Sequence, residues 1–334
     1  MPRSENQKLK LFRLLEIFWR YTDENHGLTT PEIISKLESY EILVERKTVY
    51  ADINELNKLG GFKIKKKKKG VNTYYYLTNK ILSISQLKIL VDASQAFKFI
   101  PEDTSEKLIK KLSLFSSKYE SDGLKHQVRL RGRIKTNNHV VLEVIDTLNE
   151  AITKKKIVRF KYYKWVYEDN KIQLKERHEN FLYSISPRAL VYNDENYYFI
   201  GIDETINKEK FFRVDKMKDI ELVEDERMSS PGQTDTYDIV GCVNSNFDMY
   251  AAKKENVKIE FKEDVLGVII DRFGTDIRMM DKGDGWYGTT LMNVGVSNTF
   301  FGWFFIIGMS AKIISPLHVK EKYKEYLLEQ LKNY

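Results

Sequence analysis

Residues 45–77 read ERKTVYADINELNKLGGFKIKKKKKGVNTYYYL, and they hold the densest run of positive charge in the chain. Within this stretch Val49, Ile53 and Leu56 are spaced four and three residues apart. That spacing puts the three side chains on one face and predicts a helix from about 45 to 59. The two glycines that follow are typical of a helix stop.

The rest of this predicted helix carries polar and basic side chains that can reach a partner, and we expect DNA contacts from Arg46, Lys47, Thr48, Tyr50 and Asn54. The next residues, 62–77, turn at Gly70-Val71-Asn72 between two strand-like segments, which predicts a β-hairpin. Its first strand bears five consecutive lysines, which are further candidate DNA contacts: Lys65, Lys66, Lys67, Lys68 and Lys69.

Two more helices are expected before this stretch. Apolar residues at helical spacing predict one over about 8–24, with Gly27 as its stop. Thr29 or Thr30 is a candidate N-cap for a second helix, which runs through Leu37. Three short helices and a basic hairpin describe a winged helix-turn-helix, whose helix fits the major groove while lysines meet phosphates. The alternative is a winged helix that only binds protein.

The charge distribution supports nucleic acid as the partner of this segment. The 334 residues contain 55 Lys and Arg against 48 Asp and Glu, a formal net charge of +7. Residues 1–80 hold 16 basic and 10 acidic side chains, and residues 81–334 hold 39 and 38. The surplus positive charge is therefore concentrated in the first quarter of the chain.

The segment VERKTVYADINELNKLGGFKI, residues 44–64, resembles the DeoR-like pattern vSrRTVyRDIeaLealGipi of bacterial transcription regulators. Two positions depart from that pattern. Glu45 stands where the pattern has a Ser N-cap, and Ala51 replaces an Arg that would face DNA. The resemblance implies duplex binding, but the missing arginine prevents transfer of any base preference.

The middle of the chain changes from helical to strand-like patterns. We expect linker helices over 84–120, and a helix at about 138–155. Between them Arg129, Arg131 and Arg133 alternate, either to bind nucleic acid or to pair with acidic neighbours. Five short strands over the next 65 or so residues predict a small β-barrel.

Within these strands lie Tyr162, Pro187, Leu190-Val191-Tyr192, Tyr197-Tyr198-Phe199-Ile200-Gly201 and Phe212-Arg213-Val214-Asp215-Lys216-Met217. This series is similar to the WYL domain, with the signature triplet changed to Tyr-Tyr-Phe. The resemblance implies an Sm-like barrel that senses a nucleotide, an oligonucleotide or single-stranded DNA. It carries over these ligand-binding candidates: Lys161, Tyr162, Ser186, Arg188, Tyr198 and Arg213. For each aromatic residue the alternative is packing in the barrel core, and Asp215 is a possible structural partner of Arg213.

The C-terminal quarter alternates strands and helices. Residues 285–311 lack charge, but their glycines and polar residues argue against a membrane span. The expected elements are a strand at 257–264, a helix at 265–274, strands around 287–296, a helix at 299–308, a strand at 311–314 and a helix at 317–332. This order suggests an open-faced α/β sandwich of ferredoxin-like character. The stretch 302–316 is similar to the ending that follows WYL domains, which implies dimerisation or regulation.

The fold class expected is therefore multidomain α+β. Its parts are a winged helix-turn-helix at 1–80, a helical linker at 81–137, a WYL domain at 138–228 and a C-terminal extension at 229–334. No phosphate-binding, dinucleotide, serine-hydrolase or zinc-protease motif is present, so we expect neither an enzyme nor a metal or cofactor. A single cysteine, Cys242, excludes an intramolecular disulfide, and with no signal peptide the expected location is cytoplasmic.

The function expected is a homodimeric transcription regulator that binds a double-stranded DNA operator, with repression favoured, and whose WYL domain senses a nucleotide or nucleic-acid ligand. No membrane partner is expected. The alternative is a single-stranded nucleic-acid-binding accessory factor in phage defence or DNA repair.

Overall fold

The computed structural model describes residues 9–127, 134–226, 239–245 and 252–334. The chain divides into two compact units, residues 1–137 and 138–334. The alternating arginines predicted to form a basic strip, Arg129, Arg131 and Arg133, lie outside the described residues. So does the predicted boundary between 228 and 229.

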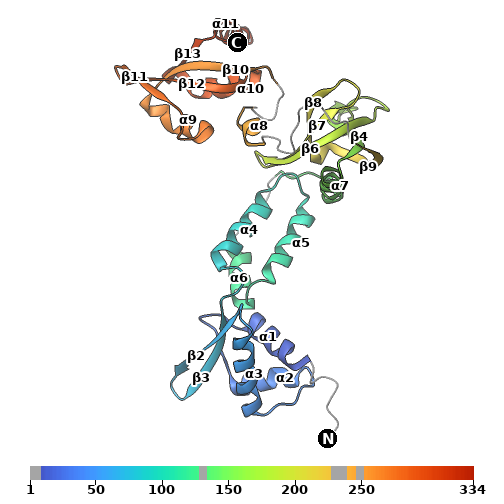
Figure 1. Ribbon diagram of the computed structural model, residues 1–334, viewed down its shortest axis with the longest axis vertical. Helices are drawn as coiled ribbons and strands as arrows, with labels where there is room; N and C mark the ends of the chain where they lie inside the picture. Colours follow the sequence, from blue (N-terminus) through green and yellow to red (C-terminus); the bar gives the residue numbers. More distant parts are fainter. Residues whose placement is uncertain (1–8, 128–133, 227–238, 246–251) are drawn as a thin grey trace. The chain divides into compact units, whose positions relative to one another are not determined.

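The first unit begins with three helices and a small sheet (Figure 1). These elements are α1 (Lys10–Tyr21), β1 (Leu28–Thr29), α2 (Thr30–Glu38), α3 (Arg46–Lys58), β2 (Lys63–Lys69) and β3 (Asn72–Thr78). The strands are antiparallel in the order β1-β3-β2. One apolar core joins the helices to the sheet, with Phe18, Ile33 and Val49 fully buried in it.

Of the predicted helix ends, the N-cap of α2 agrees with the structure and the end of α1 does not. Thr29 is the N-cap of α2 as expected, and the Glu32 carboxylate accepts hydrogen bonds from its N–H and its hydroxyl, both at 2.7 Å. The prediction that α1 extends to about residue 24 and stops at Gly27 is wrong. A Cβ at Gly27 would lie 2.8 Å from Tyr74 Cβ, so the glycine permits close packing on β3.

Helix α3 is held on its inner side by an apolar face and by one ion pair. Val49, Ile53 and Leu56 are buried, in agreement with the predicted spacing. Between them Asp52 is also buried, and its Oδ2 lies 2.9 Å from Lys10 Nζ on α1. Because both charges are largely withdrawn from water, each depends on the other as its counter-ion.

A side-chain amide fixes the β2–β3 hairpin beside α3. Asn57 Oδ1 accepts a hydrogen bond from the Ile64 N–H at 2.7 Å, and Asn57 Nδ2 donates to the Ile64 carbonyl at 3.1 Å. Both backbone groups at the start of β2 are thereby satisfied from the last turn of α3. The strand therefore leaves the core at a fixed position relative to the helix.

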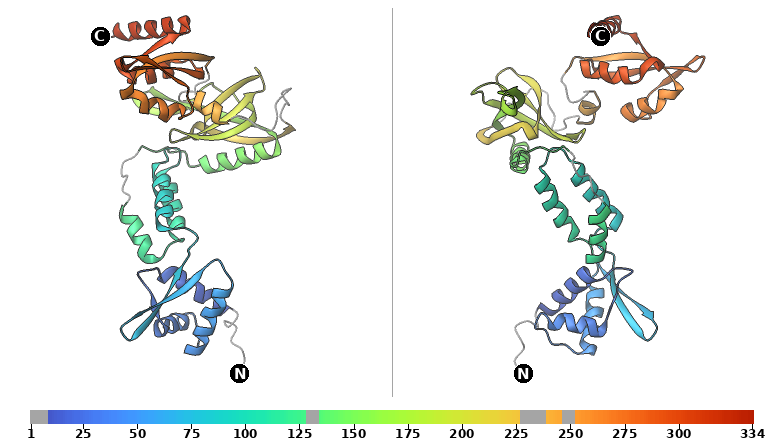
Figure 2. Two further views of the ribbon diagram at one scale, coloured as in Figure 1. Left: turned by 60° about the vertical axis from the view of Figure 1, so that its left-hand side comes forward. Right: turned by 180° about the vertical axis from the view of Figure 1, so that it is seen from behind.

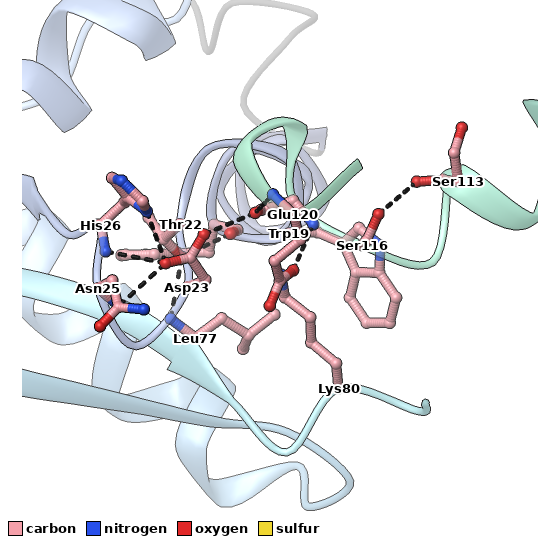
Figure 3. A network of polar contacts seen from close by, with 12 residues as sticks. Trp19, Thr22, Asp23, Asn25, His26, Leu77, Lys80, Ser113, Ser116 and Glu120 are labelled. Carbon is pink, nitrogen blue, oxygen red and sulfur yellow. Dashed lines mark hydrogen bonds and ion pairs between the residues drawn. The ribbon is translucent and has the colours of Figure 1, made fainter. Parts of the chain in front are cut away.

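The same unit continues into α4 (Ile84–Ala96), α5 (Glu102–Ser113) and α6 (Lys118–Gln127). A polar network joins the start of α6 to the segment after α1 (Figure 3). Ser117 Oγ donates to Asp23 Oδ2 at 2.7 Å, and Trp19 Nε1 donates to the Leu114 carbonyl at 2.8 Å. The His26 ring stacks on Tyr119 with centroids 3.9 Å apart. These contacts connect the three-helix part with the linker helices.

The second unit opens with α7 (Val141–Lys154), which packs against strands β4, β6 and β9 of a curled antiparallel sheet (Figure 2). The strands are β4 (Lys156–Glu168), β5 (Lys171–Glu176), β6 (Tyr183–Asn193), β7 (Asn196–Asp203), β8 (Lys208–Arg213) and β9 (Met217–Glu226). They run β5-β4-β6-β7-β8, and β9 pairs with the other edge of β4.

The expectation of five strands here is wrong, since six are present. The missed strand is β5, which pairs only with the second half of β4, at residues 163–168. Its sequence KIQLKE has no buried residue, so it lacks the apolar alternation by which strands are recognised.

The rest of the second unit is a four-stranded antiparallel sheet with helices. Its elements are α8 (Ile239–Ser245), β10 (Lys254–Lys262), α9 (Leu266–Phe273), β11 (Met279–Gly283), β12 (Trp286–Gly295), α10 (Asn298–Ile306), β13 (Ala311–Ser315) and α11 (Leu317–Leu331). The sheet order is β11-β12-β10-β13, the order of a split β-α-β arrangement. One core joins Phe261, Phe300 and Val319. None of the helices described is long and apolar enough to cross a membrane.

The Asp23 network generates a pH prediction. Burial by itself raises the pKa of Asp23, but the hydrogen bonds from Ser117, His26 and the Asn25 backbone outweigh it and leave that pKa below its ordinary value. A carboxylate with a lowered pKa stabilises the folded state above its unfolded pKa, about 3.9, and this contribution disappears as the pH falls through the folded value.

We therefore expect Asp23→Asn to increase hydrogen exchange at the start of α6 at pH 7, measured by mass spectrometry. The difference from the unsubstituted protein should begin to shrink below about pH 4, and it should vanish once the pH is below the lowered pKa of Asp23 in the folded state, where the carboxyl is protonated in both the folded and the unfolded chain. The control is Glu24→Gln, because Glu24 is an exposed neighbour. Equal exchange in both variants would contradict the role assigned to Asp23.

Candidate nucleic-acid and anion sites

The outer side of α3 is an exposed polar surface. Arg46, Lys47, Tyr50 and Asn54 are all exposed there, and Thr48 is half-buried. Glu45 is the N-cap residue, as expected, but its side chain makes no capping hydrogen bond. All five predicted residues thus lie on α3, whose opposite side is buried in the core through Val49, Ile53 and Leu56.

The lysines of the hairpin lie on two faces, although they are consecutive in sequence. In the β2–β3 register Lys66 is opposite Tyr75, and Ile64, on the same face two residues earlier, is opposite Leu77. Lys68 continues that face toward the tip of the hairpin. The other three lysines are on the reverse face, and all five are exposed: Lys65, Lys66, Lys67, Lys68 and Lys69.

A tyrosine pair connects α3 with the face of the hairpin that carries Lys66. The rings of Tyr50 and Tyr75 lie 6.2 Å apart between centroids, and Thr30 Oγ1 donates to the Tyr50 hydroxyl at 3.3 Å. Burial and the neighbouring Tyr50 raise the pKa of Tyr75. The charged side chains on this face of the hairpin are therefore Lys66 and Lys68, both exposed.

In the curled sheet, the buried Tyr162 is hydrogen-bonded to the backbone of the half-buried Arg213. The Arg213 N–H donates to the Tyr162 hydroxyl at 3.1 Å, and burial raises the pKa of Tyr162 to about 12. The Tyr162 ring packs edge-on against Phe212, with centroids 5.2 Å apart. Tyr162 is therefore a core residue, which is the alternative considered from the sequence. Its ring is not exposed to bind a ligand.

The Arg213 guanidinium is paired within the chain. Its Nε and Nη2 donate to the two oxygens of Asp215 at 3.0 and 2.9 Å. Burial disfavours the charge on Arg213, yet Asp215 outweighs it and keeps the pKa of the guanidinium above its ordinary value. Asp215 is thus the structural partner anticipated from the sequence.

Two further cations adjoin this pair, and sequence reasoning missed both. Burial lowers the pKa of Lys216, and the positive charges of Arg213 and Arg177 lower it further, against the opposing effect of Asp215. The Arg177 N–H donates to the Tyr162 carbonyl at 2.8 Å, and the positive charge of Arg177 acts to lower the pKa of Tyr162. Within the part of the chain that is described, neither Lys216 nor Arg177 forms an ion pair. The Arg213–Asp215 pair is thus accompanied by two further positive charges, of which Lys216 is half-buried and Arg177 is exposed.

Of the remaining predicted ligand residues only Tyr198 lies beside this cluster, where it helps to raise the pKa of Arg213. Lys161 pairs with Glu176 at 2.8 Å, and the Ser186 hydroxyl donates to Glu204. Arg188 is half-buried at the bulge between Pro187 and Ala189 in β6. Tyr198 is opposite Arg213 in the β7–β8 register, and it is buried in a small apolar cluster that also contains Cys242 of α8.

A cavity of about 660 Å³ lies in the first unit, away from all the predicted contact residues. Helix α1 lines it with Phe12 and Trp19, and the segment before α6 with Leu114 and Ser117. It adjoins the polar network of Figure 3. Among the described residues, no three His, Cys, Asp or Glu side chains are grouped to hold a metal ion.

Comparison with solved structures finds chains of low similarity to this one. The chain is similar to proteasome accessory factor B/C (PafBC) of Arthrobacter aurescens at 14% identity and a TM-score of 0.27, covering 94% of this chain and 45% of that one. It is also similar to a CRISPR Cas-related protein at 12% identity and a TM-score of 0.39, covering 92% and 78%. The chain thus spans less than half the length of the PafBC structure.

Among curated proteins none matches this sequence. The family model of the WYL domain matches residues 143–222, from α7 to β9. This span contains the curled sheet, the Tyr162–Arg213 pair and the cations beside it. The second unit therefore contains a WYL domain.

Proposed function

We propose that the protein is a transcription regulator that binds duplex DNA through α1–α3 and the β2–β3 hairpin, which act together as a winged helix-turn-helix. The observation that carries this proposal is the contrast between the two sides of α3. Its inner side packs in the apolar core and carries the Lys10–Asp52 ion pair, whereas Arg46, Lys47 and Asn54 are exposed on its outer side.

The chemistry of that surface suits a nucleic acid better than a protein. Arginine and asparagine side chains pair with base edges in the major groove, and an α-helix fits that groove. The exposed lysines of the hairpin then neutralise phosphates, which supplies affinity that is independent of sequence. Protein interfaces, by contrast, are depleted of lysine.

The WYL domain is the proposed sensor, an Sm-like barrel that takes an anionic effector. Lys216 and Arg177 lie beside the Arg213–Asp215 pair without a counter-ion of their own among the described residues. A phosphate group placed there would neutralise this surplus charge and accept charge-assisted hydrogen bonds. A nucleotide is the simplest effector that carries such a group.

Effector binding and operator binding are then linked, so that each changes the affinity of the other by the same factor. In this proposal the protein is a cytoplasmic homodimer that matches two half-sites and represses transcription. It has no catalytic activity of its own.

Arg46→Ala with Asn54→Ala is expected to abolish protection of the operator in footprinting, while general affinity for DNA persists.

The hairpin register predicts unequal roles for its lysines. Lys66→Ala with Lys68→Ala should reduce the slope of log K against log salt by about 1.8 for a 20-base-pair duplex, because each phosphate contact contributes about 0.9. The matched variant, Lys65→Ala with Lys67→Ala, removes the same charge from the reverse face and should change the slope less. Fluorescence anisotropy at several salt concentrations measures both. Equal slopes for the two variants would refute the assigned face.

The cation cluster predicts a phosphate requirement. Lys216→Ala should weaken binding of thymidine monophosphate by about 10- to 150-fold, because a hydrogen bond to a charged group contributes about 1.5–3 kcal/mol. Lys208→Ala is the control, since Lys208 is exposed on β8 outside the cluster. Titration calorimetry measures both variants, and an unchanged affinity in Lys216→Ala would exclude this site.

A further inference from the structure

Helix α1 carries a second apolar face beside the one that packs in the core. Leu14 and Ile17 are fully buried in the core of the three-helix part. Phe12, Leu15 and Trp19, spaced three and four residues apart, instead line the cavity between α1 and the segment from α5 to α6. Phe12 is 66% exposed, so water contacts its ring in this structure. The cavity therefore has a largely apolar wall that includes two aromatic rings.

The opposite wall comes from the end of α5 and the start of α6. Leu114, which is 68% exposed, adds apolar surface, and its carbonyl accepts the hydrogen bond from Trp19 Nε1 that fixes the indole. Ser121 of α6 also belongs to the lining and is buried. Its hydroxyl forms no hydrogen bond with any group in the part of the chain that is described. A buried hydroxyl without a partner is available to a ligand.

The charged side chains of the lining are two cations, Arg20 and Lys118, and one carboxylate, Glu16. One oxygen of Glu16 is bound by Arg13 at 2.6 Å, and Arg20 Nη1 reaches the other only at 3.4 Å. Lys118 forms no ion pair with any described residue, and its Nζ lies 5.3 Å from the Tyr21 ring centroid. The lining therefore carries more positive than negative charge.

We propose that this cavity binds a small aromatic carboxylate. Its volume of about 660 Å³ lies in the range of about 300–1,000 Å³ typical of small-molecule sites, which are mostly apolar with a few polar groups. The rings of Phe12 and Trp19 can stack on a flat apolar body, while Arg20 and Lys118 can pair with the carboxylate. None of the proposed DNA contacts or of the cations in the WYL domain lines the cavity, so this inference does not depend on the proposed function.

A ligand in this position has a structural consequence. It contacts both α1 and the segment before α6, which the Trp19–Leu114 and Ser117–Asp23 hydrogen bonds already join (Figure 3). Since the ligand binds only the folded form of this junction, it stabilises the junction against local opening.

The test uses the full chain and 2-naphthoate as the probe, with titration calorimetry as the measurement. Phe12→Ala should weaken binding about 2- to 12-fold, because it removes one aromatic contact. Leu11→Ala is the matched control and should have no effect, since Leu11 is exposed on α1 but does not line the cavity. Lys118→Ala should weaken binding about two- to fivefold, as expected for an exposed charge pair. Lys111→Ala removes an exposed lysine outside the lining and should change nothing.

Three further readouts assign the probe to this cavity. The neutral analogue 2-naphthamide should bind at least about fivefold more weakly than 2-naphthoate, because it loses both charge contacts. Bound 2-naphthoate should slow hydrogen exchange at the start of α6. Lys216→Ala should leave 2-naphthoate binding unchanged, and Phe12→Ala should leave thymidine monophosphate binding unchanged, which also shows that this variant is folded.

Three results would overturn the proposal. The first is that 2-naphthoate fails to bind at millimolar concentration or binds no more tightly than 2-naphthamide. The second is that Phe12→Ala and Lys118→Ala both leave its affinity unchanged, which would place the probe elsewhere. The third is that Phe12→Ala dissociates an oligomer seen by sedimentation without affecting probe binding, which would make this face of α1 a protein interface.

Discussion

The position of the β2–β3 hairpin beside α3 depends on the two hydrogen bonds between the Asn57 amide and the Ile64 backbone. Each such bond contributes about 1 kcal/mol, but leaving the Ile64 groups unpaired would cost more. Because Asn57 is in the last turn of α3, these bonds join the hairpin directly to the helix. The lysines and the polar face of α3 thereby form one surface.

The second organising feature is the way charges are satisfied. Buried carboxylates in both units have cations as partners, Lys10 for Asp52 and Arg213 for Asp215. Lys216 has no such partner among the described residues although burial lowers its pKa. In an ion pair each charge is already neutralised by its partner. A half-buried cation without a partner is costly to keep charged, so binding of an anion beside it is favourable. This difference distinguishes the residues that hold the fold from those available to a ligand.

Sequence patterns predicted the local elements well and the non-local contacts poorly. Helix α3 and the hairpin follow from apolar spacing and turn residues, which are properties of adjacent positions. Gly27 was misassigned because its role depends on Tyr74, far along the chain. Strand β5 was missed because it pairs outside the core and has no apolar alternation.

The candidate site in the WYL domain was predictable only in part. Lys216 follows Asp215 within the Phe-Arg-x-Asp segment and could have been found there, but Arg177 precedes β6 without any motif. The Tyr162 ring packs against Phe212, so the inward alternative was the correct interpretation of that residue. The alternation of side chains along β4 places Val158, Phe160 and Tyr162 in the core. The same alternation places Tyr163, Trp165 and Tyr167 on the other face of the strand.

The central claim is that the outer side of α3 contacts bases of duplex DNA. Ala51 is exposed on that side, close in sequence to Tyr50 and Asn54, so a photoreactive amino acid placed there probes the claim directly. The duplex used is upstream DNA that the protein protects in footprinting. We predict cross-links from position 51 to bases inside the protected region. Cross-linking that is absent from position 51, on DNA that the same protein demonstrably protects, would contradict the account.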